Sequence, residues 1–222
     1  MMDLVKAAYA RHSVRHYNEK PLSAADKNAI QNLVTRYNKE SGLHMQLVTN
    51  EPKALGCDKA VRGYFAGCVN YLVICGKGRK AEELAGYWGE HVVLYAQQRK
   101  INSCWISATY EKDFCKCTLR PGEKIIAVIA LGYGVNQGEK HESKRFGDVV
   151  KNRGSLPEWF IRGVKMALIA PTSKNQQGFT FILKPTNIVL LKNKSYSKRI
   201  DIGILKYHFE IGADEHNFEW YK

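Results

Sequence analysis

The sequence predicts an α+β fold with two halves of similar layout. A helix, a turn and a strand are expected across residues 33–48, and the same order recurs across residues 167–182. In each half a second apolar strand follows, and then a helix that precedes a tryptophan, Trp105 or Trp220. Self-similarity at this scale is typical of pseudo-symmetric folds, although a helix–strand–strand–helix order is also common without duplication. We expect a mixed, mainly antiparallel sheet flanked by helices, in pseudo-duplicated halves.

The first two helices are predicted from their end signals. A short helix is expected at residues 2–10. Ser23 can cap the next helix, and Asp26, three residues later, resembles the second member of a capping box. We expect this helix to reach Glu40, because Gly42 can take the left-handed conformation that ends many helices.

The middle of the chain alternates strands with one long helix. Strands are expected at residues 44–49 and 71–75. Apolar side chains at helical spacing predict a long helix at residues 81–100. Residues 124–133 form a nearly continuous apolar run, which favours a strand in the centre of the sheet.

A polar stretch separates the two halves. Residues 136–155 are polar and contain three glycines, so we expect a linker or lid there. We interpret residues 1–222 as a single unit, with approximate halves 1–135 and 156–222. The second half is expected to contain a helix at residues 159–169, two strands and a helix at residues 200–213.

The excess of basic residues is compatible with nucleic-acid binding. The formal net charge is +13, from 34 Lys and Arg against 21 Asp and Glu. Such an excess could supply phosphate contacts to a nucleic acid. The basic residues are scattered, however, and no helix-turn-helix, RRM or zinc-finger pattern occurs. We expect no nucleic-acid partner, and a basic surface that draws anionic small molecules into a cleft.

Other sequence patterns favour a cytoplasmic protein and argue against disulfides, a zinc site and a dinucleotide-binding loop. No run of eighteen apolar residues occurs, so we expect no membrane span. Residues 1–15 do not resemble a secretory signal, and the six cysteines form no disulfide framework. Cys104, Cys115 and Cys117 lack a fourth zinc ligand at suitable spacing. Residues 76–81 loosely match the GxGxxA motif of dinucleotide-binding loops. We interpret them as a basic turn, because the next predicted strand does not end in an acidic residue that could bind the ribose.

Two short segments carry the strongest chemical signal. Residues 11–15 place two guanidiniums and a hydroxyl within five positions, and guanidinium forks suit phosphate oxygens. Residues 170–177 follow an apolar run with a proline, hydroxyls and carboxamides. Such groups can bind the edge of a planar heterocycle without adding charge. Together the two segments predict a site for a phosphorylated aromatic cofactor.

These segments resemble motifs of the FMN-dependent nitroreductase family. That family opens with Arg-x-Ser-x-Arg and also carries an Ala-Pro-Ser-x-x-Asn-x-Gln segment, a Ser-Cys-Trp segment, a strand ending in Leu-Gly-Tyr and a later Lys/Arg pair. The counterparts here are residues 11–15, 170–179, 101–105, 122–133 and 144–145. The resemblance covers most of the chain and implies a three-layer α/β/α-like fold.

Two departures refine the resemblance. The Asn-containing block usually precedes the Ser-Cys-Trp segment, whereas here it comes last, and the usual Pro-Trp after it is Gly178-Phe179. This order resembles the branch in which one chain looks like the family's usual dimer, shortened and fused. The resemblance then implies one complete site in a monomer or a loose homodimer.

The resemblance also implies a mechanism and a set of binding residues. FMN would carry the chemistry, NADH or NADPH would reduce it, and a small-molecule acceptor such as a nitroaromatic, a quinone or another flavin would be reduced in turn. No side chain would itself be catalytic, and no metal is expected. The implied cofactor-binding residues are Arg11, Ser13, Arg15, Ser107, Ala108, Lys144, Arg145, Thr172, Ser173, Asn175 and Gln177. A non-catalytic flavin-binding protein stays open as an alternative, as does, less strongly, a basic nucleic-acid-binding protein.

Overall fold

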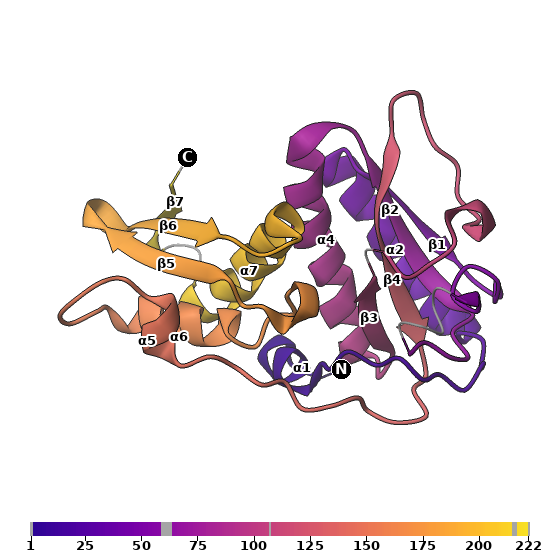
Figure 1. The fold of residues 1–222 in the computed structure, drawn as a ribbon, viewed down its shortest axis with the longest axis horizontal. Coiled ribbons are helices and arrows are strands. Elements are labelled where there is room, and N and C mark those ends of the chain that lie inside the picture. The colour runs from indigo at the N-terminus through magenta and orange to yellow at the C-terminus, as the bar shows by residue number, and fades with distance from the viewer. Residues whose placement is uncertain (1, 59–63, 107, 215–216, 222) are drawn as a thin grey trace.

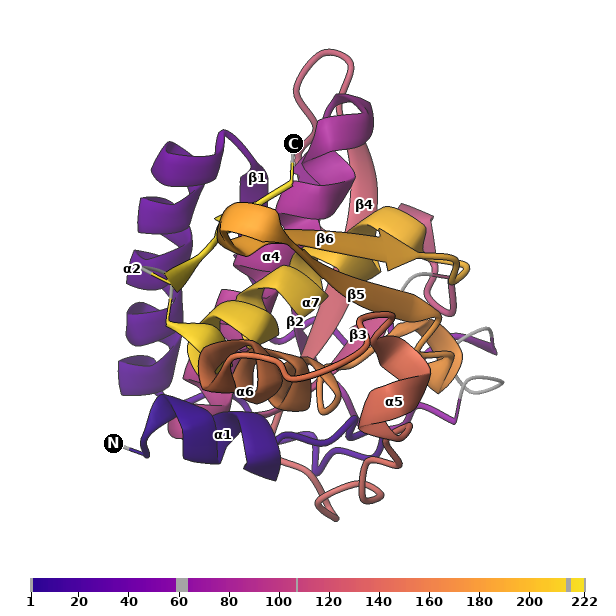
Figure 2. The same cartoon turned by 90° about the vertical axis from the view of Figure 1, so that its left-hand side faces the viewer.

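Two long helices lie between two sheets in the computed structural model, which describes residues 2–58, 64–106, 108–214 and 217–221. The helices are α4, Gly78–Gln98, and α7, Lys198–Ala213 (Figure 1). A four-stranded sheet lies on the α4 side and a three-stranded sheet on the α7 side. Figure 2, turned by 90°, shows α7 crossing in front of α4. The molecule is therefore organised around this helix pair.

The first two helices begin and end where their caps require. Helix α1, Leu4–Ala10, starts after Asp3, whose carboxylate accepts backbone N–H groups of the first turn. Helix α2, Ala24–Ser41, starts after Ser23, whose Oγ accepts the backbone N–H of Asp26 at 3.1 Å. Gly42 ends α2 with a φ of 72° in the left-handed region. Both predicted caps of α2 are confirmed.

The larger sheet belongs to the first half. Its strands are β1, His44–Val48; β2, Asn70–Gly76; β3, Asn102–Ile106; and β4, Lys124–Gly132. They are antiparallel in the order β1-β2-β4-β3. Strand β4 is therefore an inner strand, as its apolar sequence predicted, and β2 beside it is buried along its whole length.

The smaller sheet and its helices form the second half. Helix α6, Glu158–Ala167, precedes β5, Phe179–Lys184, and β6, Ile188–Asn193; β7, Glu219–Trp220, follows α7. Strands β5 and β6 are antiparallel, whereas β6 and β7 are parallel. Phe160, Phe181 and Phe209 are buried together, and the rings of Phe181 and Phe209 stack with centroids 5.0 Å apart. The α+β class, with mixed but mainly antiparallel sheets, is confirmed.

Helices α4 and α7 approach each other closely at two glycines. A Cβ atom on Gly86 would collide with the carbonyl oxygen of Ile200, and one on Gly203 would collide with the carbonyl oxygen of Glu83. The contact is reciprocal, since each helix presents a glycine to the other's backbone. Larger residues at either position would force the helices apart. The relative position of the two halves depends on these glycines.

The stretch at residues 136–155 is more ordered than a simple linker. It runs along the lower edge of the molecule in Figure 1 and contains the short helix α5, Phe146–Val149. Beyond α5, Val150 forms a bridge with Phe181. The Asn152 amide bonds the backbone N–H and C=O of Leu183, each at 2.7 Å. The end of the stretch is thereby attached to the edge of the smaller sheet.

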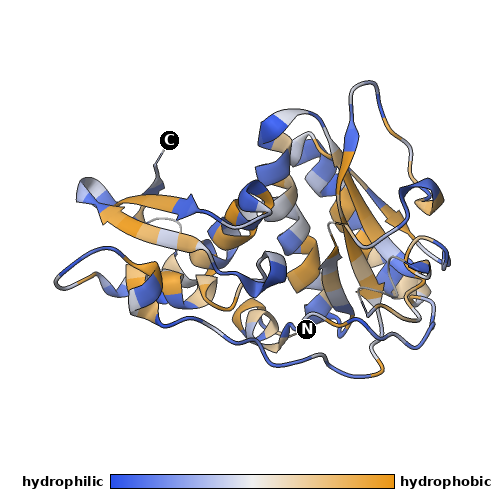
Figure 3. Ribbon diagram, in the orientation of Figure 1, coloured by the Kyte–Doolittle hydropathy of each residue, from blue (hydrophilic) through white to orange (hydrophobic). Residues whose placement is uncertain are grey.

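Apolar residues concentrate on the strands and on the helix sides that face them (Figure 3). Ile74, Ile129 and Leu131 of the larger sheet have no exposed surface and pack with Val92 of α4. Within the described residues, no helix combines the length and apolarity needed to cross a bilayer.

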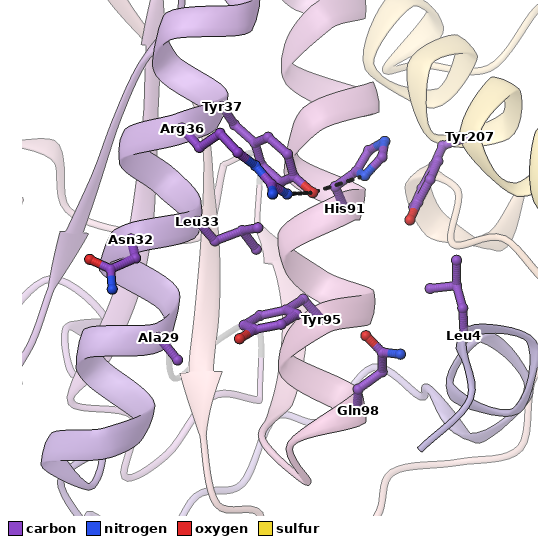
Figure 4. A pocket seen from close by; sticks show the side chains of 10 residues that line it. All are labelled: Leu4, Ala29, Asn32, Leu33, Arg36, Tyr37, His91, Tyr95, Gln98 and Tyr207. Carbon is purple, nitrogen blue, oxygen red and sulfur yellow. Dashed lines mark hydrogen bonds between the residues drawn. The ribbon is translucent and has the colours of Figure 1, made fainter. Parts of the chain in front are cut away.

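Tyr37, His91 and Tyr207 form an aromatic cluster. The cluster lies beside a cavity of about 690 Å³ between α1, α2, α4 and α7 (Figure 4). The Arg36 guanidinium donates to Tyr37 Oη at 3.2 Å, and that hydroxyl lies 3.3 Å from His91 Nδ1. The His91 ring stacks on Tyr207 with centroids 3.5 Å apart. Burial, reinforced by the nearby Arg36 charge, lowers the pKa of His91 to about 3.

We predict that His91 makes stability fall in acid. Its native pKa lies below the unfolded value, so its contribution is intact above about pH 6.5 and is lost as pH falls toward 3. Between pH 7 and pH 5.5 the wild type should lose about 1 kcal/mol more unfolding free energy than His91→Gln, a difference measurable by urea denaturation. Equal losses in the two proteins would show that His91 is not held neutral.

Candidate functional site

The candidate site is a cavity of about 790 Å³ between the two halves. This volume lies within the range of about 300–1,000 Å³ that is usual for small-molecule sites. The first half contributes residues 11–15, strand β3 and the segment after it. The second half contributes residues 171–175 and the start of α7, and residues 139–142 line the cavity between them. Both predicted motifs therefore meet in one chain.

Arg11 is the most unusual lining residue. It caps the C-terminus of α1 and is only 4% exposed, yet its Nε has no hydrogen-bond partner in the part of the chain that the structure describes. No carboxylate among the described residues forms an ion pair with it. Burial lowers the pKa of the Arg11 guanidinium, although the negative charge of Glu90 opposes the shift. A buried, unpaired cation beside a cavity fits an anionic ligand group such as a phosphate.

Ser13 and Arg15 reach the cavity because their segment is extended. Ser13 bridges Ser103 in parallel fashion, and the backbone N–H of Val14 donates to the carbonyl of Ser103 at 3.1 Å. Side chains alternate along such a segment. Val14 is fully buried in the core, while Ser13 and Arg15 line the cavity on the other side. Attachment to β3 thus aims the predicted pair into the site.

The second-half loop holds a strained backbone. Lys174, Asn175 and Gln177 have φ values of 53°, 51° and 44°, in the left-handed region that side chains usually avoid. Strain of this kind persists only where surrounding bonds enforce it. Here the backbone N–H of Gln177 donates to Thr172 Oγ1 at 3.1 Å, and that of Ser173 donates to Asp201 Oδ1 at 3.2 Å. Thr172, Ser173 and Asn175 all line the cavity.

Two carboxamides tie this loop to the segment that crosses the cavity. Asn175 Nδ2 and Gln177 Nε2 both donate to the carbonyl of Glu142, at 2.9 and 2.7 Å. Gln177 Oε1 accepts the backbone N–H of Lys144 at 2.8 Å. Gln177 is only 3% exposed and does not line the cavity. It acts as a structural anchor for the loop, whereas Asn175 lines the cavity while its Oδ1 accepts a hydrogen bond from Gln177 Nε2 at 2.9 Å.

Lys144 and Arg145 do not line the cavity. The Lys144 ammonium donates to the carbonyl of Gln177 at 2.9 Å. The Arg145 side chain is 89% exposed and pairs with Asp148 at 3.2 Å. Of the predicted partners after β3, Ala108 lines the cavity, whereas Ser107 lies outside the described residues.

Several lining residues carried no sequence signal for this site. Asp201, in the first turn of α7, is buried and accepts hydrogen bonds from Ser173 and from the hydroxyl of Ser195. Burial raises the pKa of the Asp201 carboxyl. Tyr196 is 80% exposed at the cavity, and His141 bonds the carbonyl of Leu168 at 2.9 Å. Only folding brings these residues to the motifs, because they are distant in sequence.

Comparison with solved structures supports the fold. A structure from Thermotoga maritima described as a "putative nitroreductase" matches with a TM-score of 0.69 and 19% identity, covering 98% of this chain and 87% of that one. A nitroreductase with bound FMN from Desulfitobacterium hafniense matches with a TM-score of 0.54 and 16% identity, covering 69% of this chain and all of that one (100%). Nitroreductase A from Vibrio parahaemolyticus matches with a TM-score of 0.53 and 14% identity, covering 71% and 78%.

The sequence itself matches one family model. No curated protein matches this sequence. The family model described as "Putative TM nitroreductase" matches residues 3–213, a span that contains both motifs and every described residue lining the cavity. This chain therefore belongs to that nitroreductase family.

Proposed function

We propose that the protein is an FMN-dependent oxidoreductase that uses NADH or NADPH to reduce a small-molecule acceptor. The observation that carries the proposal is Arg11, a buried guanidinium whose Nε has no hydrogen-bond partner among the described residues, beside a cavity that both halves complete. Membership of a nitroreductase family supports a flavin oxidoreductase. The Desulfitobacterium hafniense nitroreductase, which shares the fold, is described with bound FMN.

In this proposal each part of FMN has partners among the cavity residues. Arg11 and Ser13 would donate to the phosphate and ribityl chain, while Thr172, Ser173 and Asn175 would contact the polar edge of the ring. Arg15 would face the N1–C2 carbonyl edge, where a cation stabilises negative charge. The backbone N–H of Ala108 would lie toward N5. When bound, FMN would supply two-electron chemistry by accepting a hydride at N5 from NAD(P)H and passing electrons to the acceptor.

The chain's own contribution is binding, orientation and access. Ile106 and Ile204 supply buried apolar walls, which would exclude water from the ring. Exposed Tyr196 at the cavity offers an aromatic surface to a flat acceptor such as a nitroaromatic, a quinone or another flavin. Lys144 and Arg145 are not among the residues proposed to bind the phosphate, because both bond other groups of the protein.

We predict that the purified protein binds FMN and that NADH or NADPH bleaches the bound flavin. An absorbance scan after adding FMN and removing the excess should show the two bands of oxidised flavin, and anaerobic addition of NADH or NADPH should abolish the longer-wavelength band. Binding without bleaching would identify a non-catalytic flavin protein. The absence of flavin binding would contradict the proposed function.

We predict that Arg11→Ala weakens FMN binding by about 2 to 4 kcal/mol, because a buried charge-assisted contact is lost. Fluorescence titration with FMN measures the change. Arg79→Ala removes the same charge from an exposed position at the start of α4, so it serves as the matched control and should bind like the wild type. Wild-type affinity in Arg11→Ala would remove Arg11 from the site.

We predict that one chain completes one site by itself. Arg11 and Asn175 line the same cavity of a single chain, so Arg11→Ala and Asn175→Ala should each impair FMN binding. An equimolar mixture of the two variants should bind no better than their average, measured by flavin titration after co-refolding. Recovery of binding in the mixture would require a site shared between chains and would contradict the single-chain arrangement.

A further inference from the structure

Behind the candidate site lies a buried hydrogen-bonded group that the proposed function does not use. It consists of Glu90 on α4, His208 on α7 and Trp105 on β3. Neither Glu90 nor His208 has exposed surface. Trp105 Nε1 donates to Glu90 Oε2 at 2.8 Å, and His208 Nε2 lies 2.8 Å from Glu90 Oε1. The group therefore joins both halves at the helix crossing, and Trp105 also lines the cavity.

The two oxygens of Glu90 are both engaged. The indole N–H can only donate, so Glu90 Oε2 is an acceptor. With its proton on Nε2, His208 donates the second hydrogen bond, to Glu90 Oε1. His208 Nδ1 has no partner within the described part of the chain. The carboxylate is consequently restrained from two directions, by a strand of the first half and by a helix of the second.

Arg11 follows α1, which packs on α4, and it lines the same cavity as Trp105, the side chain that donates to Glu90. The Glu90 charge is the largest electrostatic influence that raises the pKa of Arg11. Yet no ion pair joins Arg11 to Glu90, or to any other carboxylate of the described residues. In a low-dielectric interior a free carboxylate and a guanidinium attract strongly. The two hydrogen bonds to Glu90 oppose this attraction, because they hold its oxygens toward Trp105 and His208.

We propose that Trp105 and His208 are positioning residues that hold the Glu90 carboxylate away from Arg11, so that the guanidinium stays available to a ligand phosphate. The proposal rests on the proposed function, in which Arg11 binds the phosphate of FMN. Loss of either hydrogen bond would release Glu90 to pair with Arg11. The released carboxylate would then compete with the phosphate for the same guanidinium.

This competition predicts a difference between two ligands. FMN carries the phosphate, whereas riboflavin has the same ring and ribityl chain without it. In His208→Leu, FMN should bind about tenfold more weakly, as expected for the loss of a contact to a charged group. Riboflavin affinity should not change. In the double variant His208→Leu/Glu90→Gln, the competing charge is absent, so FMN affinity should return toward the wild-type value.

The test is a fluorescence titration of purified wild-type and variant proteins with FMN and with riboflavin, with thermal melting to confirm folding. Trp105→Phe keeps an aromatic wall and removes the other donor, so it should weaken FMN binding in the same way and be rescued by Glu90→Gln. If His208→Leu does not fold, Trp105→Phe and Trp105→Phe/Glu90→Gln test the proposal in its place. Glu83→Gln is the control, because it breaks the 2.6 Å ion pair with Lys206 across the same helix crossing; its FMN affinity should equal that of the wild type.

Three results would overturn the proposal. Equal weakening of FMN and riboflavin would indicate a general loss of pocket shape. Failure of Glu90→Gln to rescue either variant would show that Glu90 does not compete for Arg11. A wild type that binds both flavins equally well would mean that the phosphate is not held by Arg11, while leaving flavin binding intact. Only a wild type that binds neither flavin would contradict the proposed function itself.

Discussion

The close crossing of α4 and α7 is the constraint on which the structure depends. Gly86 and Gly203 let each helix backbone touch the other, so the two sheets and their helices are fixed at one distance. The start of α7 supplies Asp201 and Ile204 to the cavity, and α4 supplies Glu90 behind it. A larger residue at either glycine would force the helices apart and so move Asp201 and Ile204 away from Glu90. The site therefore depends on a backbone contact at the start of α7, where Ile200, Asp201 and Ile204 line the cavity.

Within this frame, polar groups near the cavity fall into two kinds. Most are satisfied inside the protein: Gln177 bonds Lys144 and Glu142, and Asp201 accepts from Ser173. These bonds hold a loop with left-handed residues in place, which costs free energy that only a rigid surrounding can offset. Arg11 differs, since it is buried and its Nε has no hydrogen-bond partner among the described residues. The contrast distinguishes groups that build the site from the group that is available to bind.

The sequence predicted some of the residues that line the cavity but not the direction of every polar side chain. Residue types with phosphate and amide chemistry marked residues 11–15 and 170–177, and the described lining of the cavity includes Arg11, Ser13, Arg15 and Asn175. The same reasoning could not separate Gln177, which is buried as an anchor, from its neighbour Asn175. The family resemblance also implied that Lys144 and Arg145 bind the cofactor, although Lys144 bonds a backbone carbonyl and Arg145 bonds Asp148. Which way a polar side chain points depends on partners that are distant in sequence.

The sequence by itself determined the features that arise from nearby residues. The caps of α2 at Ser23 and Gly42 and the inner position of β4 follow from local hydrogen bonding, backbone freedom and apolar runs. Tertiary structure alone decided that Glu90, His208 and Trp105 meet, that Asp201 enters the cavity, and that Arg11 is left without an ion-pair partner in the described chain. The physical reason is that burial and charge pairing are set by which surfaces come into contact, and those surfaces belong to elements far apart in the chain, such as those of Glu90 and His208, which are 118 residues apart.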